Sequence, residues 1–344
     1  MILPQPPNLP FTPLVVPALV QTISPPSVDL KLKQANSGLV YNVTTPPNLQ
    51  QSRELQTIVN EAVSLTAAKG LSQSPLSMTL IDVKSGEIAG YQQQQLNYPA
   101  SLVKLFWMVA LYAGLERGII PNERALTSDL YKMIHYSDNN AASRILDKVT
   151  TAKSGSSLYG QTYKNWLQKR NQITNFFQLA GYKNLNINQK VYPIGYLNLG
   201  LPKGRELQMR GDRKKPIRNM MTTDHAARLL YEIFTGQSVS LAASTRMAQL
   251  LTRDLRPEAA EDNNSIYIEN LLGQSLPSDV YLAGKAGWTS SVRHHAAYVS
   301  SRDGQTAYII VIFTSDRAYV RNQQIFPTIS RLVFDRMTAR SSLK

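Results

Sequence analysis

Hydrophobic and polar positions follow two different patterns along this chain of 344 residues. Short alternating or continuous apolar runs, typical of β-strands, lie toward the two ends of the chain. The residues from Lys84 to Glu87 predict a hairpin turn between the first two of these strands. The predicted strands are 77–83, 88–92, 280–285, 295–300 and 307–314.

Helical periodicity fills most of the rest. The helices that we predict are 53–70, 101–116, 126–149, 173–180, 223–236 and 321–337. Glycines 70 and 118 can end two of them as left-handed caps. Because strands at both ends flank helices in the middle, we expect an α/β fold. One antiparallel sheet would be built from both chain ends, with a mostly helical lobe, about 101–255, inserted between them.

The first 50 residues differ in composition from the rest, since they hold ten of the nineteen prolines. They predict an extended, largely disordered tail or tether, followed by one domain at 51–344. No signal peptide or transmembrane segment is visible, because the first basic residue is Lys31 and Pro17 breaks the best early apolar run. Either this start lies downstream of the true one or the protein stays inside the cell.

The net charge of +14 is concentrated between residues 151 and 220, which hold thirteen Lys or Arg and two acids. This basic segment could attract an anionic cell-wall polymer or a lipid surface, or it could be only a solubilising face. We expect no nucleic-acid partner, because no binding motif is present and aromatics do not interleave the basic residues. The absence of cysteine excludes disulfides, thiolate metal sites and a cysteine nucleophile.

A Ser-x-x-Lys pattern opens the helix predicted at 101–116. Ser101 and Lys104 are three residues apart and therefore lie on one face of the first turn. The hydroxyl would sit at the positive end of the helix dipole, beside an amine whose pKa burial and cations can lower. Such a base is what a serine nucleophile needs. The same pattern at Ser341–Lys344 has no comparable setting, so the pattern alone is weak.

Two further motifs stand out. Ser137-Asp138-Asn139 places three small polar residues inside the predicted helix 126–149, where they are locally unfavourable. Gly284-Lys285-Ala286-Gly287 ends a predicted strand and places a cation at a sheet edge, with a glycine that lets a substrate approach the backbone. By themselves the first could be a polar helix face or a helix kink, and the second an exposed strand lysine before a turn.

The order of the three motifs resembles that of class A β-lactamases and penicillin-binding proteins, over about residues 53–340. The resemblance implies that Ser101 attacks the carbonyl of a β-lactam or an acyl-D-amino-acid peptide and that Lys104 takes its proton. It implies a proton relay through Ser137, supported by Lys285. It also implies substrate contacts from Asn139 and Gly287, and an oxyanion hole from the backbone N–H groups of Ser101 and Trp288.

The sequence departs from the family pattern in four ways. Only 36 residues separate Ser101 from Ser137, and the segment after Asn139 is long and basic. Ala286 stands where the family has Thr or Ser, so Thr289, Ser290 or Arg293 would have to bind the substrate carboxylate. The deacylating glutamate is not obvious either. Its expected place holds Gln189, Lys190 and Val191, and the remaining candidate base is Glu206.

We therefore expect a serine hydrolase that hydrolyses β-lactams with slow deacylation. A D-Ala-D-Ala carboxypeptidase or other amidase or esterase, and a non-turnover binder of cell-wall fragments or β-lactams, are the alternatives. No cofactor is expected. No metal is expected either, because His294 and His295 are adjacent on a predicted strand and point to opposite faces. We expect a monomer, and the resemblance implies a periplasmic or cell-envelope location.

Overall fold

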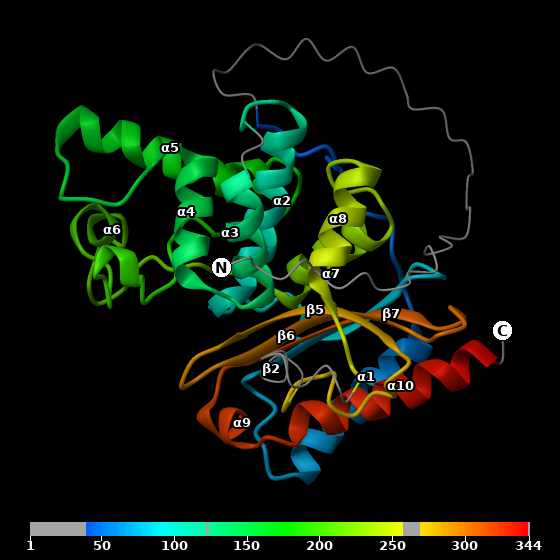
Figure 1. Ribbon diagram of the computed structural model, residues 1–344. Helices are drawn as coiled ribbons and strands as arrows, with labels where there is room; N and C mark the ends of the chain where they lie inside the picture. The colour runs from blue at the N-terminus through cyan, green and yellow to red at the C-terminus, as the bar shows by residue number, and fades with distance from the viewer. Residues whose placement is uncertain (1–38, 122–123, 257–268, 343–344) are drawn as a thin grey trace. The chain divides into compact units, whose positions relative to one another are not determined.

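The computed structural model describes residues 39–121, 124–256 and 269–342, with the backbone alone at 124 and 125. Within these residues seven strands form one sheet in the order β1-β3-β2-β7-β6-β5-β4 (Figure 1). The strands are β1 (Gln50–Gln51), β2 (Leu76–Asp82), β3 (Glu87–Tyr91), β4 (Thr252–Arg253), β5 (Tyr281–Trp288), β6 (Arg293–Ser300) and β7 (Ala307–Thr314).

The two ends of the chain meet in the middle of this sheet. β2 pairs antiparallel with β7, from Leu76 opposite Thr314 to Asp82 opposite Tyr308. β5, β6 and β7 follow one another as antiparallel neighbours. The expected α/β fold, with a sheet built from both chain ends, is therefore confirmed. One short strand departs from the antiparallel expectation, since β1 pairs parallel with β3.

Helices cover both faces of the sheet (Figure 1). One face packs against α1 (Arg53–Ala68), α9 (Arg317–Arg321) and α10 (Ile325–Ser342). The other carries the helical lobe, which consists of η1 (Ala100–Leu102), α2 (Val103–Glu116), α3 (Arg124–His135), α4 (Asn139–Thr150), α5 (Gly160–Gln178), η2 (Gly195–Leu197), α6 (Gly204–Met209), α7 (Thr223–Phe234) and α8 (Leu241–Leu251). No helix in the described ranges is long and apolar enough to cross a membrane.

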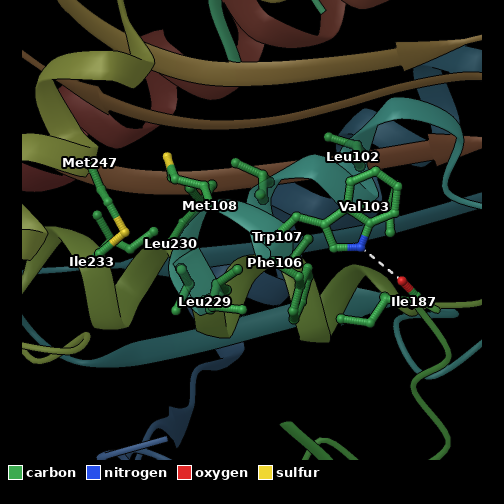
Figure 2. Packing of buried hydrophobic residues seen from close by; sticks show 14 of the residues in the cluster. Leu102, Val103, Phe106, Trp107, Met108, Ile187, Leu229, Leu230, Ile233 and Met247 are labelled. Carbon is green, nitrogen blue, oxygen red and sulfur yellow. Dashed lines mark hydrogen bonds between the residues drawn. The ribbon is translucent and has the colours of Figure 1, made fainter. Parts of the chain in front are cut away.

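The helix α2 lies at the centre of the lobe. Residues 102–111 are all buried, so this helix is enclosed on every side, as its nearly continuous apolar sequence requires. Figure 2 shows its side chains packed among Leu229, Leu230 and Met247 of α7 and α8. The indole of Trp107 also donates a hydrogen bond of 2.8 Å to the carbonyl of Ile187. A helix fixed in this way is a rigid support for the residue at its start, Ser101.

The predicted helix 126–149 is wrong as one element. The structure has two helices there, α3 and α4, with Tyr136, Ser137 and Asp138 between them. Asp138 caps α4, because its side chain accepts a hydrogen bond of 2.6 Å from the amide of Ala141. Ser137 has a positive φ of 55°, which ends helical geometry for a residue with a side chain. The three small polar residues at 137–139, which are unfavourable inside a helix, thus coincide with the break between α3 and α4.

The predicted tail also ends too late. Tyr41 is 1% exposed, and its hydroxyl donates a 2.6 Å hydrogen bond to Glu232 inside the helical lobe. Residues 39–50 therefore belong to the packed unit, while 1–38 lie outside the described residues. Other boundaries shift as well. α5 begins at Gly160 rather than at 173, and α9 and α10 replace the single helix predicted at 321–337.

Candidate active site

Ser101 sits in a tight turn that leads into α2. Its two neighbours, Ala100 and Leu102, are buried, whereas Ser101 itself is partly exposed. Ala100 has a φ of 48°, a left-handed conformation that costs a residue other than glycine about 1 kcal/mol or more. The packing of α2 holds this turn, so the hydroxyl of Ser101 has a fixed position at the start of the helix.

The amine of Lys104 lies at the centre of a polar cluster. Its Nζ atom donates to Ser101 Oγ at 3.0 Å and to Asn139 Oδ1 at 2.7 Å. It also donates to the Ser137 carbonyl at 2.6 Å and lies 3.3 Å from Ser137 Oγ. Burial lowers the pKa of Lys104 to about 7, and the charge of Asp138 offsets part of that lowering. Near neutral pH a large fraction of this amine is therefore uncharged and able to accept a proton.

Lys285, on the sheet, contacts the second of these serines, Ser137. Its Nζ donates to Ser137 Oγ at 2.8 Å and to the Ala286 carbonyl at 3.0 Å. β5 continues to Trp288, so Lys285 lies inside the strand and not at its end as predicted. Burial holds the pKa of Lys285 well below its usual value, and the charges of Lys104 and Arg253 lower it further. Ser137 Oγ thus lies between two buried amines.

The end of strand β5 packs closely against the residues that lead into α2. A Cβ atom at Gly287 would lie only 2.8 Å from the Pro99 carbonyl and 3.0 Å from the Ser101 amide nitrogen. Only glycine lets the strand come this close to Ser101. Trp288 ends the strand and is 45% exposed, and the exposed residue Thr289 follows, just before the bend at Ser290 and Ser291. Ala286, which replaces the hydroxyl residue of the family pattern, is buried.

The structure leaves two of the predicted residues outside this cluster. The guanidinium of Arg293 donates to the carbonyls of Val320 at 2.6 Å and Asn322 at 3.0 Å, so α9 holds it. Glu206 is buried, with both carboxylate oxygens bonded to Arg170 and one also to Ser154. The guanidinium of Arg293, which the sequence suggested for the substrate carboxylate, is therefore already engaged with two carbonyls at the end of α9.

The residues at the expected place of the deacylating acid are also held by other parts of the protein. Lys190 forms an ion pair of 2.7 Å with Asp147. The backbone amide of Gln189 donates to Asn219 Oδ1, and Asn219 Nδ2 donates to the backbone carbonyl of Gln189. The contacts of Lys190 and Arg170 with Asp147 anchor the basic segment to α4, whereas the Gln189–Asn219 and Arg170–Glu206 contacts join parts of the segment to one another. Two of its thirteen cations, Arg170 and Lys190, are therefore buried and neutralised rather than exposed.

One further residue near the site, Arg253, was not predicted from the sequence; it is buried, and its charge acts on Lys285. No sequence signal could have found it, because a single arginine after a helix has no pattern around it. His294 and His295 do point to different partners, the Tyr98 carbonyl and the Leu272 amide. Over the described residues, no group of three or more His, Asp or Glu gathers to hold a metal ion.

This arrangement suits acyl transfer. A serine hydroxyl lies within hydrogen-bond distance of an amine with a pKa near neutrality, which is the pairing that activates a nucleophile. A second hydroxyl, on Ser137, connects that amine to a second lysine. Three segments far apart in sequence supply these groups: the start of α2, the turn before α4, and β5.

Comparison with known proteins agrees with this geometry. The family model described as the beta-lactamase enzyme family matches residues 122–337, which include Ser137 and Lys285 but begin after Ser101. No curated protein matches the chain significantly.

Solved structures share the fold at low sequence identity. A beta-lactamase from Sphaerobacter thermophilus DSM 20745 is 17% identical with a TM-score of 0.57, over 82% of this chain and 97% of that one. PBP-A is 18% identical with a TM-score of 0.58, over 86% and 99%. The L158E mutant of PBP-A, solved as an acyl-enzyme complex with penicillin G, is 17% identical with a TM-score of 0.58, over 85% and 99%. By its matched sequence and its fold, the chain belongs to the beta-lactamase enzyme family, among the β-lactamase-like and penicillin-binding serine hydrolases.

Proposed function

We propose that this protein forms an acyl-enzyme with β-lactams through Ser101 and releases the product slowly. The observation that carries the proposal is the 3.0 Å contact between Lys104 Nζ and Ser101 Oγ, at a lysine whose pKa burial lowers to about 7. A lysine in water is almost entirely protonated at neutral pH and would be a poor base. This one can take the proton of Ser101.

The proposed acylation needs three proton transfers. Neutral Lys104 accepts the hydroxyl proton as Ser101 Oγ bonds to the substrate carbonyl carbon. Ser137 then gives its proton to the leaving nitrogen as the C–N bond breaks, and protonated Lys104, whose Nζ lies 3.3 Å from Ser137 Oγ, passes the proton that it took from Ser101 to Ser137. Lys285 holds Ser137 and attracts the substrate carboxylate, while the backbone N–H groups of Ser101 and Trp288 stabilise the oxyanion.

The proposed substrate contacts come from Asn139, Gly287 and Thr289. Asn139 would bind the acyl-amide group, although Lys104 occupies its Oδ1 atom in this structure. Gly287 leaves room for the substrate beside the backbone of β5. For the carboxylate that Ala286 cannot bind, the exposed residue Thr289 is better placed than Arg293, whose guanidinium is held by α9.

Slow deacylation follows from the position of the one acid proposed for it. Hydrolysis of the acyl-enzyme needs a base that activates water. Glu206 is engaged with Arg170 and Ser154, in a buried ionic cluster. The fold of PBP-A L158E, which was captured as an acyl-enzyme with penicillin G, is consistent with a stable adduct on this scaffold.

Two other functions use the same site. A D-Ala-D-Ala carboxypeptidase, or another amidase or esterase, would use the same nucleophile on an acyl-D-amino-acid peptide. A non-turnover binder of β-lactams or cell-wall fragments is favoured by the buried Ala286 and the engaged Glu206. Family membership favours the periplasm or cell envelope, where the exposed lysines and arginines of the basic segment could meet an anionic polymer or lipid surface.

The intact mass of the protein after addition of penicillin G, followed over time, tests the proposal. An adduct that forms and is lost over minutes supports slow hydrolysis, and a permanent adduct supports the binder. Ser101→Ala should form no adduct, with Ser341→Ala, from the second Ser-x-x-Lys pattern, as its matched control. Rapid release of D-Ala from an acyl-D-Ala-D-Ala peptide would favour the carboxypeptidase. Labelling of Ser101→Ala at the wild-type rate would refute the assignment.

A further inference from the structure

Arg253 occupies a buried place at the edge of the sheet. It lies on the two-residue strand β4, which pairs with β5 through Leu282, and its side chain is 4% exposed. One guanidinium nitrogen lies 2.8 Å from His135 Nδ1 and donates to the His135 carbonyl at 3.3 Å. The other donates to the carbonyls of Ile134 at 2.9 Å and Gly284 at 3.5 Å.

These contacts join two segments that carry site residues. The carbonyls of Ile134 and His135 belong to the last turn of α3, where helical carbonyls lack partners within the helix and favour a cation. Ser137 follows His135 by two residues, and Lys285 follows Gly284 by one. A single planar side chain therefore holds the end of α3 against β5, at the point where the Ser137–Lys285 contact of 2.8 Å is made.

The charged groups around Lys285 indicate a second effect of Arg253, through its charge. Its titratable or charged neighbours are Lys104 on α2, Arg253 on β4, His135 at the end of α3 and His295 on β6. Burial lowers the pKa of His135 to about 4 and that of His295 to about 3, so both rings are neutral. Asp138, the acid of the Ser-Asp-Asn turn, acts on Lys104. Arg253 is thus the permanent positive charge of this group.

We infer that Arg253 is a positioning residue for acyl transfer: it fixes the Ser137 turn to β5, and its own constant positive charge acts on Lys285. This inference rests on the proposed function. Removal of the guanidinium should loosen the Ser137–Lys285 contact and slow acylation. Removal of its charge should also let Lys285 keep its proton to higher pH, because a neighbouring cation disfavours a second one. A purely structural arginine would produce only the first effect.

The experiment compares wild type with Arg253→Gln and Arg253→Lys, using the rate constant for acylation by penicillin G between pH 5 and 10. In Arg253→Gln we expect a rate at pH 7 lower by up to about 100-fold. We also expect the alkaline limb of the profile to move up by about one pH unit or more. Arg253→Lys keeps the charge but loses the planar donor pair, so its rate should fall while its limb stays in place. Arg246→Gln, an exposed arginine on α8, is the matched control.

A second measurement does not depend on acylation. The NMR titration of the His135 ring should move upward from a pKa of about 4 in Arg253→Gln, because one of the cations that lower it is gone. A wild-type rate, or an unmoved alkaline limb, in Arg253→Gln would overturn the inference. If that variant does not fold, a wild-type rate in Arg253→Lys does the same. If wild type forms no acyl-enzyme, the proposed function fails and this inference with it, whereas the His135 titration still reports whether the contact exists.

Discussion

The proposed base role of Lys104 gives the sharpest prediction. Its pKa of about 7 means that half of the amine is neutral at pH 7. With an ordinary lysine pKa near 10.5, about one molecule in 3,000 would be neutral. Burial therefore increases the population of the active base about 10³-fold. Below pH 7 the acylation rate should fall about tenfold for each pH unit, since protonated Lys104 cannot accept the proton of Ser101.

Two substitutions separate this effect from packing. Lys104→Met keeps most of the buried volume and should slow acylation by roughly 10²–10⁴-fold, the usual contribution of a positioned base. Lys104→Arg keeps the charge but cannot become neutral, so it should be slowed at least as much. In both variants the acid limb centred near pH 7 should disappear. Lys164→Met, at an exposed position on α5, is the control and should keep the wild-type profile.

The assay is the second-order acylation rate constant with penicillin G from pH 4.5 to 9, obtained from intact mass or rapid mixing. A pH-independent rate in wild type would contradict the base role, because it would mean that no group with a pKa near 7 controls the step. A change of less than threefold in Lys104→Met would remove this lysine from the mechanism altogether.

Three further outcomes follow from named contacts. Glu206→Gln should leave the adduct lifetime nearly unchanged. It should lower the free energy of unfolding by about 3–5 kcal/mol in a denaturant titration, because it removes the negative charge that pairs with the buried Arg170. A trapped adduct would instead make Glu206 the deacylating base. Gly287→Ala should reduce the acylation rate by about 100-fold, because its methyl group would lie 2.8 Å from the Pro99 carbonyl; an unchanged rate would mean that β5 can move away without cost. Retention of the protein on anionic lipid vesicles should fall steeply with salt, and it should weaken in a triple variant in which Arg213, Lys214 and Lys215 are all changed to Gln. Retention that does not depend on salt would mean that the basic segment is only a solubilising face.

The helix predicted through Ser137, which the structure breaks there, shows what a sequence pattern can and cannot predict. Apolar periodicity continued through the motif and predicted one helix from 126 to 149. The three small polar residues opposed that prediction, and the structure resolves the opposition with a capped break at Asp138. Local propensity indicated that something unusual happens there, but not which way the chain turns.

The boundary at residue 50 was wrong for a related reason. Proline content predicted a tail, since such segments rarely bury enough apolar surface to fold alone. Tyr41 nevertheless enters the core, because Glu232, Tyr182 and Ser238 form a buried network that accepts its hydroxyl. None of these partners is near Tyr41 in sequence, so no local pattern could indicate the contact.

The sequence by itself determined the fold class, the pairing of strands from the two chain ends, and the identity of Ser101, Lys104, Ser137 and Lys285 as candidates. These follow from periodicity and from short motifs, which act over a few residues. The tertiary structure decided what those residues do to one another. The lowered pKa of Lys104, the attachment of Arg293 and Glu206 to other parts of the protein, and the contacts of Arg253 all depend on burial and on charges brought together from distant segments. Desolvation and electrostatic interactions depend on distance in space, and a sequence records only distance along the chain.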